Sequence, residues 1–102
     1  STTIELSRQD YVVARQEALD AVRREIARRE ETLQTLAAEQ ERIRRNMQTV
    51  DRKAESFAMW ERKLVQQEQE IDALHQALEA LRADETAKAA DLARFLAALD
   101  AA

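Results

Sequence analysis

At 102 residues the chain is one domain or a fragment of one, and its composition, dominated by alanine, glutamate, arginine, glutamine and leucine, is typical of long helices and coiled coils. Without cysteine it can form neither a disulfide nor a thiolate metal site, and no apolar run approaches the roughly 20 residues of a membrane-spanning helix. The net charge of −4 argues weakly against general affinity for nucleic acid.

Residues 1–6 are the one stretch that lacks a helical pattern. Ile4 and Leu6 alternate with polar residues, and threonine and isoleucine favour strands. Six residues cannot form a sheet alone, so we expect a strand-like stub or a linker from a β domain. Ser7 followed by Asp10 matches the positions of a capping box, which predicts that the first helix begins at Ser7.

A heptad pattern covers residues 7–50 and predicts the first helix. Apolar side chains recur in two series, at Val12, Leu19, Ile26, Leu33 and Met47 and at Val22, Leu36, Ile43 and Val50. Arg15 and Arg29 occupy positions of the second series. We expect their aliphatic stems to lie in the buried stripe with the guanidinium groups in water, and the alternative is that they fix the register or bind a partner's carboxylates.

The heptad phase slips at residues 51–56, which predicts a turn. Asp51 and Ser56 are both residue types that cap helices. The competing arrangement is one unbroken helix that forms a parallel dimer. A continuous stripe would then need a stammer at this point, so we favour the turn.

The turn lies within a basic segment. Residues 42–63 carry a charge of +4, and the rest of the chain carries −8. The basic residues are Arg42, Arg44, Arg45, Arg52, Lys53, Arg62 and Lys63. Basic residues beside aromatic ones can bind nucleic acid or another anionic surface. Because Phe57 and Trp60 also belong to the heptad pattern, we favour solvated charge over a closed apolar end.

A second heptad pattern over residues 57–99 predicts the second helix. Its apolar series are Phe57, Leu64, Ile71, Leu78, Leu92 and Leu99, and Trp60, Leu74, Leu81 and Phe95. His75 follows Asp72 by one turn, which is half of a di-metal motif. His75 is the only histidine and lies at an outward position, so we predict no metal and no cofactor.

The two patterns are mirror images about the turn. Pairing residues whose numbers add to 107 gives twelve layers, seven of them apolar on both sides. Four layers are mixed: Arg29/Leu78, Val22/Glu85, Leu19/Lys88 and Arg15/Leu92. In the remaining layer Gln40 faces Gln67, and we expect the two amides to satisfy one another. The pattern therefore predicts an all-α fold, an antiparallel two-helix coiled-coil hairpin.

Alanines form a stripe outside these layers, at Ala14, Ala18, Ala21, Ala73, Ala77, Ala80 and Ala87. The helix preference of alanine explains them as well as a contact face does. As a contact face, they would let two hairpins pair into a four-helix bundle. Charged residues of the mixed layers would then pair across chains, as Arg15 with Glu85.

The residues around the turn carry a resemblance to a known family. They are Gln40, Arg42-Ile43-Arg44, Asn46-Met47, Val50-Asp51-Arg52, Phe57, Trp60, Lys63-Leu64, Gln67-Glu68, Ile71 and Leu74. Over residues 40–74 the chain resembles the helical hairpin of a bacterial family of unknown function that includes mucoidy inhibitor A-like proteins. Val50 stands where that pattern has leucine, and Phe57 and Trp60 stand where tyrosines are usual. The resemblance implies a hairpin that projects from a β-rich domain without known enzymatic activity.

We therefore predict a structural or protein-interaction hairpin, which acts as a spacer or assembly arm of a larger bacterial protein in the cytoplasm or cell envelope. Its partner is a second copy or a helical protein. An enzyme is not expected, because two helices alone enclose no pocket for catalytic groups. The alternative is contact between the basic tip and nucleic acid or another anionic surface.

Overall fold

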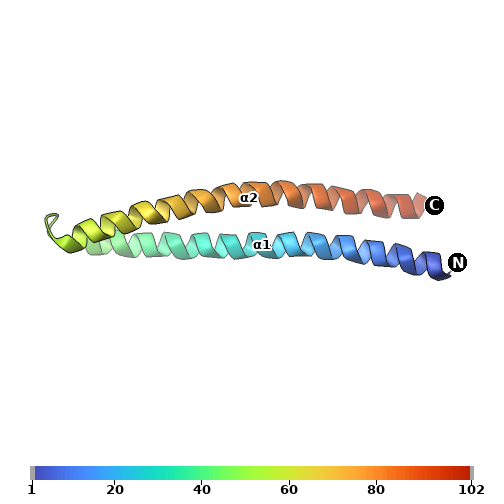
Figure 1. Cartoon of the computed structure of the whole chain (residues 1–102), viewed down its shortest axis with the longest axis horizontal. Helices are drawn as coiled ribbons and strands as arrows, with labels where there is room; N and C mark the ends of the chain where they lie inside the picture. The colour runs from blue at the N-terminus through green and yellow to red at the C-terminus, as the bar shows by residue number, and fades with distance from the viewer. Residues whose placement is uncertain (1, 102) are drawn as a thin grey trace. The chain divides into compact units, whose positions relative to one another are not determined.

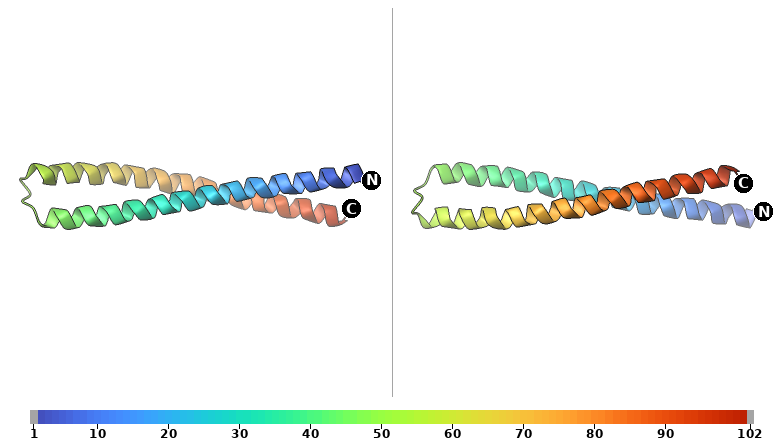
Figure 2. Two further views of the ribbon diagram at one scale, coloured as in Figure 1. Left: turned by 90° about the horizontal axis from the view of Figure 1, so that it is seen from below. Right: turned by 90° about the horizontal axis from the view of Figure 1, so that it is seen from above.

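The computed structural model describes the backbone of residues 2–101 and the side chains of residues 7–101. Two helices account for nearly all of them, α1 (Thr2–Gln48) and α2 (Glu55–Ala101), and residues 49–54 form the loop between them. The helices run antiparallel (Figure 1), and two further views show the same course (Figure 2). No described residue is in a strand, so the predicted all-α helical hairpin is confirmed.

The chain divides into two compact units. The terminal unit comprises Ser1–Ala27 and Glu79–Ala102, and the tip unit comprises Arg28–Leu78. Within each unit, a segment of α1 packs against a segment of α2. All contacts discussed below lie within one unit or the other.

The strand-like stub predicted at residues 1–6 is wrong for Thr2–Leu6, while the linker alternative stays a prediction. Thr2–Leu6 belong to α1, so there is no strand there, and Ser7 and Asp10 lie inside the helix and do not form a capping box at its start. Ser1 lies outside the described residues. A strand needs a partner to hydrogen-bond, whereas adding a residue to an existing helix needs no new nucleus. Helix extension therefore outweighs the strand preference of threonine and isoleucine.

The loop lies two residues earlier than the predicted turn at 51–56. Asp51 Oδ1 accepts a hydrogen bond from Lys53 N at 2.9 Å, and Asp51 O accepts one from Ala54 N at 3.0 Å. Asp51 therefore closes a turn inside the loop and does not cap α2. Ser56 lies within α2, whose first turn is closed by the Phe57 N to Ala54 O bond at 3.1 Å. No described residue has a positive φ angle, so this loop forms without glycine.

The predicted buried stripe is present in both units. We call the residues of the twelve predicted layers, from Val12/Phe95 to Val50/Phe57, the seam. Every side chain of the seam is buried or half-buried. Two hydrogen bonds between the helices lie one residue away from the predicted layers, in which residue numbers add to 107. Arg23 bonds Glu85 in the terminal unit and Gln40 bonds Glu68 in the tip unit, and in each pair the residue numbers add to 108. Both contacts are therefore consistent with the predicted register.

The mixed layers contain most of the buried apolar side chains. Six apolar side chains of the described residues are buried: Leu19, Val22, Ile26, Ile43, Leu78 and Leu92. Four of the six belong to the layers predicted to be mixed, including Leu78 at 1% exposed and Leu19 at 3%. A lysine or arginine covers its apolar neighbour with a long aliphatic stem while its charge stays in water. These layers therefore bury apolar surface better than their composition suggests.

Candidate interaction surfaces

The seven basic residues predicted as a recognition tip lie in the tip unit, and two of them are already paired. Arg42 donates to Glu39 from Nε at 3.0 Å and from Nη2 at 2.6 Å, and Lys63 Nζ of α2 lies 3.4 Å from the same carboxylate. This cluster ties α1 to α2 along one edge of the seam. It removes Arg42 and Lys63 from the charge that is free to meet a ligand.

The charge cluster shifts the pKa of its members. The hydrogen bond from Arg42, with a further contribution from Lys63, lowers the pKa of Glu39 from its ordinary value of 4.5 to about 2. The same hydrogen bond raises the pKa of Arg42. Both shifts favour the charged pair at neutral pH.

The other five basic side chains of the tip have no such partner. They are Arg44, Arg45, Arg52, Lys53 and Arg62. All five are exposed, and their side chains make no ion pair or hydrogen bond with any described residue. Residues 42–63 of the tip unit, which carry a net charge of +4, therefore present unpaired basic side chains to solvent.

A shallow groove in the tip unit combines this charge with apolar surface. Its lining includes Arg44, Met47, Val50, Arg52, Phe57 and Leu64. The four apolar residues belong to the seam and are half-buried, so part of each side chain is accessible from the groove. Two unpaired arginines and an apolar floor from both helices thus share one surface, which we call the tip groove.

The aromatic residues of the tip are less accessible. Phe57 and Trp60 are half-buried in the seam, as the heptad pattern predicts. The exposed large hydrophobic side chains of the tip unit are Met59 and Val65, and neither is aromatic. No described aromatic ring at the tip therefore stands free for a base to stack on.

The alanine stripe is divided between the two units. In the terminal unit Ala14, Ala18, Ala21 and Ala80 are exposed, and Ala18 lines a groove together with Ala87 and Asp84. In the tip unit Ala73 is exposed and Ala77 is half-buried. The structure therefore brings Ala18 of α1 close to Ala87 of α2, on the same face of the terminal unit.

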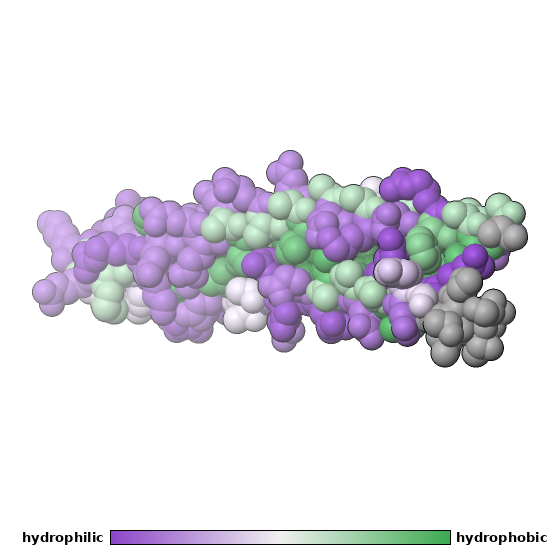
Figure 3. Space-filling view, turned by 45° about the vertical axis from the view of Figure 1, so that its right-hand side comes forward, coloured by the Kyte–Doolittle hydropathy of each residue, from purple (hydrophilic) through white to green (hydrophobic). Residues whose placement is uncertain are grey.

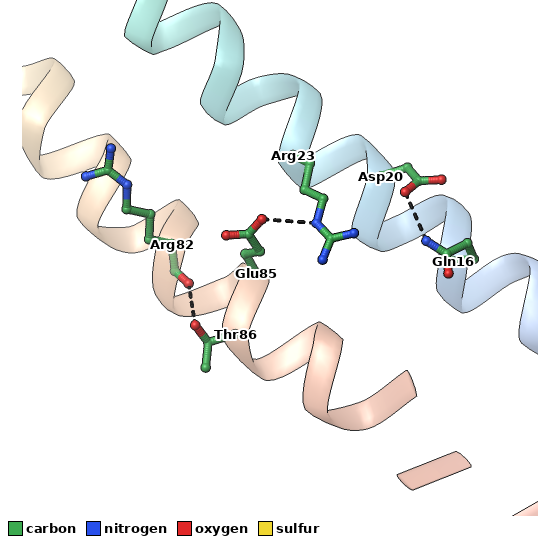
Figure 4. Close-up of polar contacts among 6 residues, drawn as sticks. All are labelled: Gln16, Asp20, Arg23, Arg82, Glu85 and Thr86. Atoms are coloured by element: carbon green, nitrogen blue, oxygen red, sulfur yellow. Dashed lines mark hydrogen bonds and ion pairs between the residues drawn. The ribbon is translucent and has the colours of Figure 1, made fainter. Parts of the chain in front are cut away.

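The charged seam residues of the terminal unit have partners in their own chain. Arg23 Nε of α1 donates to Glu85 Oε2 of α2 at 3.1 Å, as Figure 4 shows, and Lys88 Nζ donates to Asp84 Oδ1 at 2.6 Å. Arg15 lies 3.3 Å from Asp91 and not against Glu85. Each of these charges thus has a partner within its own chain, and the ion pairs across chains expected for a four-helix bundle stay a prediction.

Arg15 also lies beside a pair of aromatic rings, a contact that the heptad pattern did not predict. Its guanidinium carbon is 4.1 Å from the ring centre of Phe95 and 5.8 Å from that of Tyr11, and the two rings meet edge to face. A guanidinium over an aromatic face is attracted by the ring's quadrupole. The signal in the sequence was Tyr11, an aromatic residue just outside the seam and one turn before Arg15.

The glutamine layer differs from the prediction. Gln40 and Gln67 are both buried, but Gln40 Nε2 donates to Glu68 Oε1 at 3.1 Å, and Gln67 Oε1 has no hydrogen-bond partner among the described residues. The expected amide pair is therefore wrong. A carboxylate is a stronger acceptor than an amide oxygen, and Glu68 adjoins the layer at its edge.

Apolar side chains are also exposed on the terminal unit. Tyr11, Val13 and Leu96 are at least 41% exposed, and Val13 lines a groove with Val12 and Leu99. Figure 3 shows hydrophobic residues (green) gathered over this unit. Both units therefore expose apolar side chains, which accompany the alanine groove in the terminal unit and the unpaired basic side chains of residues 42–63 in the tip unit.

Comparisons with protein-family models, with curated proteins and with solved structures found no match to the chain. Among the described residues, neither helix is long and apolar enough to cross a membrane. The described side chains also contain no group of three or more histidine, cysteine, aspartate or glutamate residues placed to hold a metal ion.

Proposed function

We propose that the chain is a structural, protein-interaction hairpin: a coiled coil that acts as a spacer or assembly arm of a larger bacterial protein. It self-associates, or binds a helical partner, through the face of the terminal unit that carries Ala18 and Ala87. The observation that carries this proposal is the groove between these alanines, on a unit that also exposes Tyr11, Val13 and Leu96. Small side chains permit close approach of a further helix, and exposed apolar area gains free energy when it is covered.

The coiled-coil interpretation is supported by the heptad spacing of the seam and by its burial on both helices. The grooves among the described residues are open to solvent, which favours binding over catalysis, because catalytic groups need a pocket that excludes water. The bacterial setting, and the larger protein with a β-rich domain, rest on the family resemblance of residues 40–74 alone.

Self-association can be tested by placing charge in the alanine groove. The double variant Ala18→Glu/Ala87→Glu puts a carboxylate on each side of the groove, outside the seam, where Asp84 and Asp91 already lie. We expect sedimentation to show an assembly for the wild-type chain and a monomer for the variant, with equal helix content by circular dichroism.

The matched control is Ala27→Glu/Ala90→Glu, which adds the same charge at exposed alanines of the same unit, one on each helix and outside the groove. This variant should assemble as the wild type does. A wild-type chain that remains monomeric at high concentration would refute self-association, and equal dispersal of both variants would refute the alanine face.

A second candidate function is contact between the basic tip and nucleic acid or another anionic surface. The observation that favours it is the set of five exposed basic side chains without partners in the tip unit. Binding of this kind should weaken steeply as salt is added. It uses a different unit from the alanine face, so both functions can hold together.

A further inference from the structure

We propose that the tip groove binds an acidic amphipathic helix of a partner protein, seating an aliphatic side chain of that helix between Arg44 and Arg52. The proposal rests on the second candidate function and names its ligand class. It is independent of self-association through the terminal unit.

The rim of the groove supplies the charge recognition. Arg44 comes from α1 and Arg52 from the loop, and both guanidinium groups are exposed and unpaired. Arginine binds carboxylates in a planar, bidentate geometry and is less strongly hydrated than lysine, so it loses less on leaving water. Two such groups at one groove fit a ligand with carboxylates on either side of its apolar contact.

The floor of the groove supplies the apolar contact. Met47 and Val50 line it from the α1 side, and Phe57 and Leu64 line it from α2. All four are half-buried, so an aliphatic side chain placed there would cover apolar area that the seam leaves partly open. Methionine adapts its shape to different apolar partners, which suits a binding floor.

The arginines of the rim and the apolar floor together favour an acidic amphipathic helix over other anionic ligands. An amphipathic helix presents aliphatic and acidic side chains on one face at spacings of three and four residues. Single-stranded nucleic acid would need stacking platforms, but Phe57 and Trp60 are half-buried, and the exposed large hydrophobic residues of this unit are Met59 and Val65. The observations therefore favour a protein ligand.

The binding experiment uses the full chain and a labelled probe peptide of about 15 residues, four turns of helix, with leucine along one face and glutamate elsewhere. Fluorescence anisotropy at low salt should show binding that weakens as salt rises. A peptide with glutamine in place of glutamate tests the rim, and one with serine in place of leucine tests the floor. Both should bind at least about tenfold more weakly than the parent peptide.

The variants separate the groove from general positive charge. Arg44→Glu/Arg52→Glu should weaken peptide binding by about tenfold or more. Arg45→Glu/Lys53→Glu makes the same change in net charge at tip residues outside the groove lining, and it should weaken binding only about two- to threefold. Circular dichroism of both variants should match the wild-type chain.

Equal losses for the two variants, or no binding of the parent peptide, would overturn the proposal. Tighter binding of a single-stranded oligothymidylate, or of vesicles containing an anionic lipid, would overturn it in favour of that ligand. The Ala18→Glu/Ala87→Glu chain should bind the peptide as the wild type does, so failure of self-association and failure of the tip groove can be told apart.

Discussion

The terminal unit and the tip unit accommodate polar groups in the seam in different ways. In the terminal unit, Arg15 and Lys88 occupy seam positions and form ion pairs with Asp91 and Asp84 at the edge, although the buried Arg15 Nε makes no hydrogen bond with a described residue. In the tip unit, Gln40 and Gln67 are buried, and Gln67 keeps an oxygen without a partner. A long charged side chain can cover apolar surface and still reach water, whereas a glutamine is too short to do so. Each unit therefore leaves one buried polar atom of the seam without a hydrogen bond among the described residues, but in the terminal unit that atom belongs to a side chain whose charge has an acidic partner.

The outer surfaces of the two units differ as well. The terminal unit offers small and apolar side chains, which suit close packing of another helix, and the tip unit offers arginines around an apolar floor. Contact by close packing depends on shape and weakly on salt, while contact by charge depends strongly on salt. Salt titration of assembly and of peptide binding should therefore distinguish the two units.

The largest expected effect tests whether mixed layers carry the core. Leu78, in the predicted mixed layer with Arg29, is 1% exposed, while Leu74, in the predicted apolar layer with Leu33, is half-buried. Leu78→Ala should lower the free energy of unfolding by about 3–5 kcal/mol, and Leu74→Ala by about 2 kcal/mol. Urea unfolding followed by circular dichroism measures both. If Leu74→Ala lowers the free energy of unfolding by more than Leu78→Ala does, the apolar layers contribute more to stability than the mixed layers.

The next effect isolates the aliphatic stem of Lys88, which shares a predicted layer with Leu19 in the terminal unit. Lys88→Met keeps most of the stem and removes the charge, so it should be nearly neutral despite the loss of the ion pair with Asp84. Lys88→Ser removes the stem and should cost about 1–2 kcal/mol by uncovering Leu19, which is now 3% exposed. Equal costs in urea unfolding would assign the role to the charge and not to the stem.

A smaller effect is expected at the glutamine layer of the tip unit. Gln67→Leu removes a buried oxygen without a partner and should raise the free energy of unfolding by about 1 kcal/mol. Gln40→Leu removes a hydrogen bond to Glu68, so its apolar gain is offset and the net change should be smaller. A destabilised Gln67→Leu variant would indicate that its amide finds a partner in solution.

Some of this arrangement could be predicted from the sequence, for physical reasons. A repeat of seven residues determines which side chains face a neighbouring helix, so the seam, the hairpin and the register followed from the spacing alone. The spacing does not determine where the end of a long side chain lies. The partners of Arg15, Gln40 and Glu85 were therefore missed, because each depends on rotamers and on residues just outside the seam.

The ends of the helices were predicted less well than their middles. The predicted turn at 51–56 and the observed loop at 49–54 differ by two residues, because hydrogen bonds of Asp51 and Ala54 decide where α1 ends and α2 begins. The heptad pattern also did not predict the tip groove. The basic residues of the tip could be identified from the sequence. The sequence did not show that Arg42 and Lys63 pair with Glu39 and that the other five basic side chains are unpaired.

The smallest effect concerns the charge cluster that links α1 to α2 in the tip unit. The pKa of Glu39 falls from 4.5 to about 2 in the folded chain, first because of the hydrogen bond from Arg42. A carboxylate whose pKa is lower in the folded state stabilises that state above its unfolded pKa, and this contribution disappears as the pH falls from about 4.5 to about 2. Glu39→Gln should therefore lose less stability than the wild-type chain over that range in urea unfolding at stepped pH.

The control is Glu41→Gln, two residues further along, because Glu41 is exposed and makes no ion pair with any described residue. The difference should shrink as salt is added, since the cluster lies at the surface. Parallel pH curves for the wild type and Glu39→Gln would show that the cluster contributes nothing to folding, and that Arg42 and Lys63 are as free as the other basic residues of the tip.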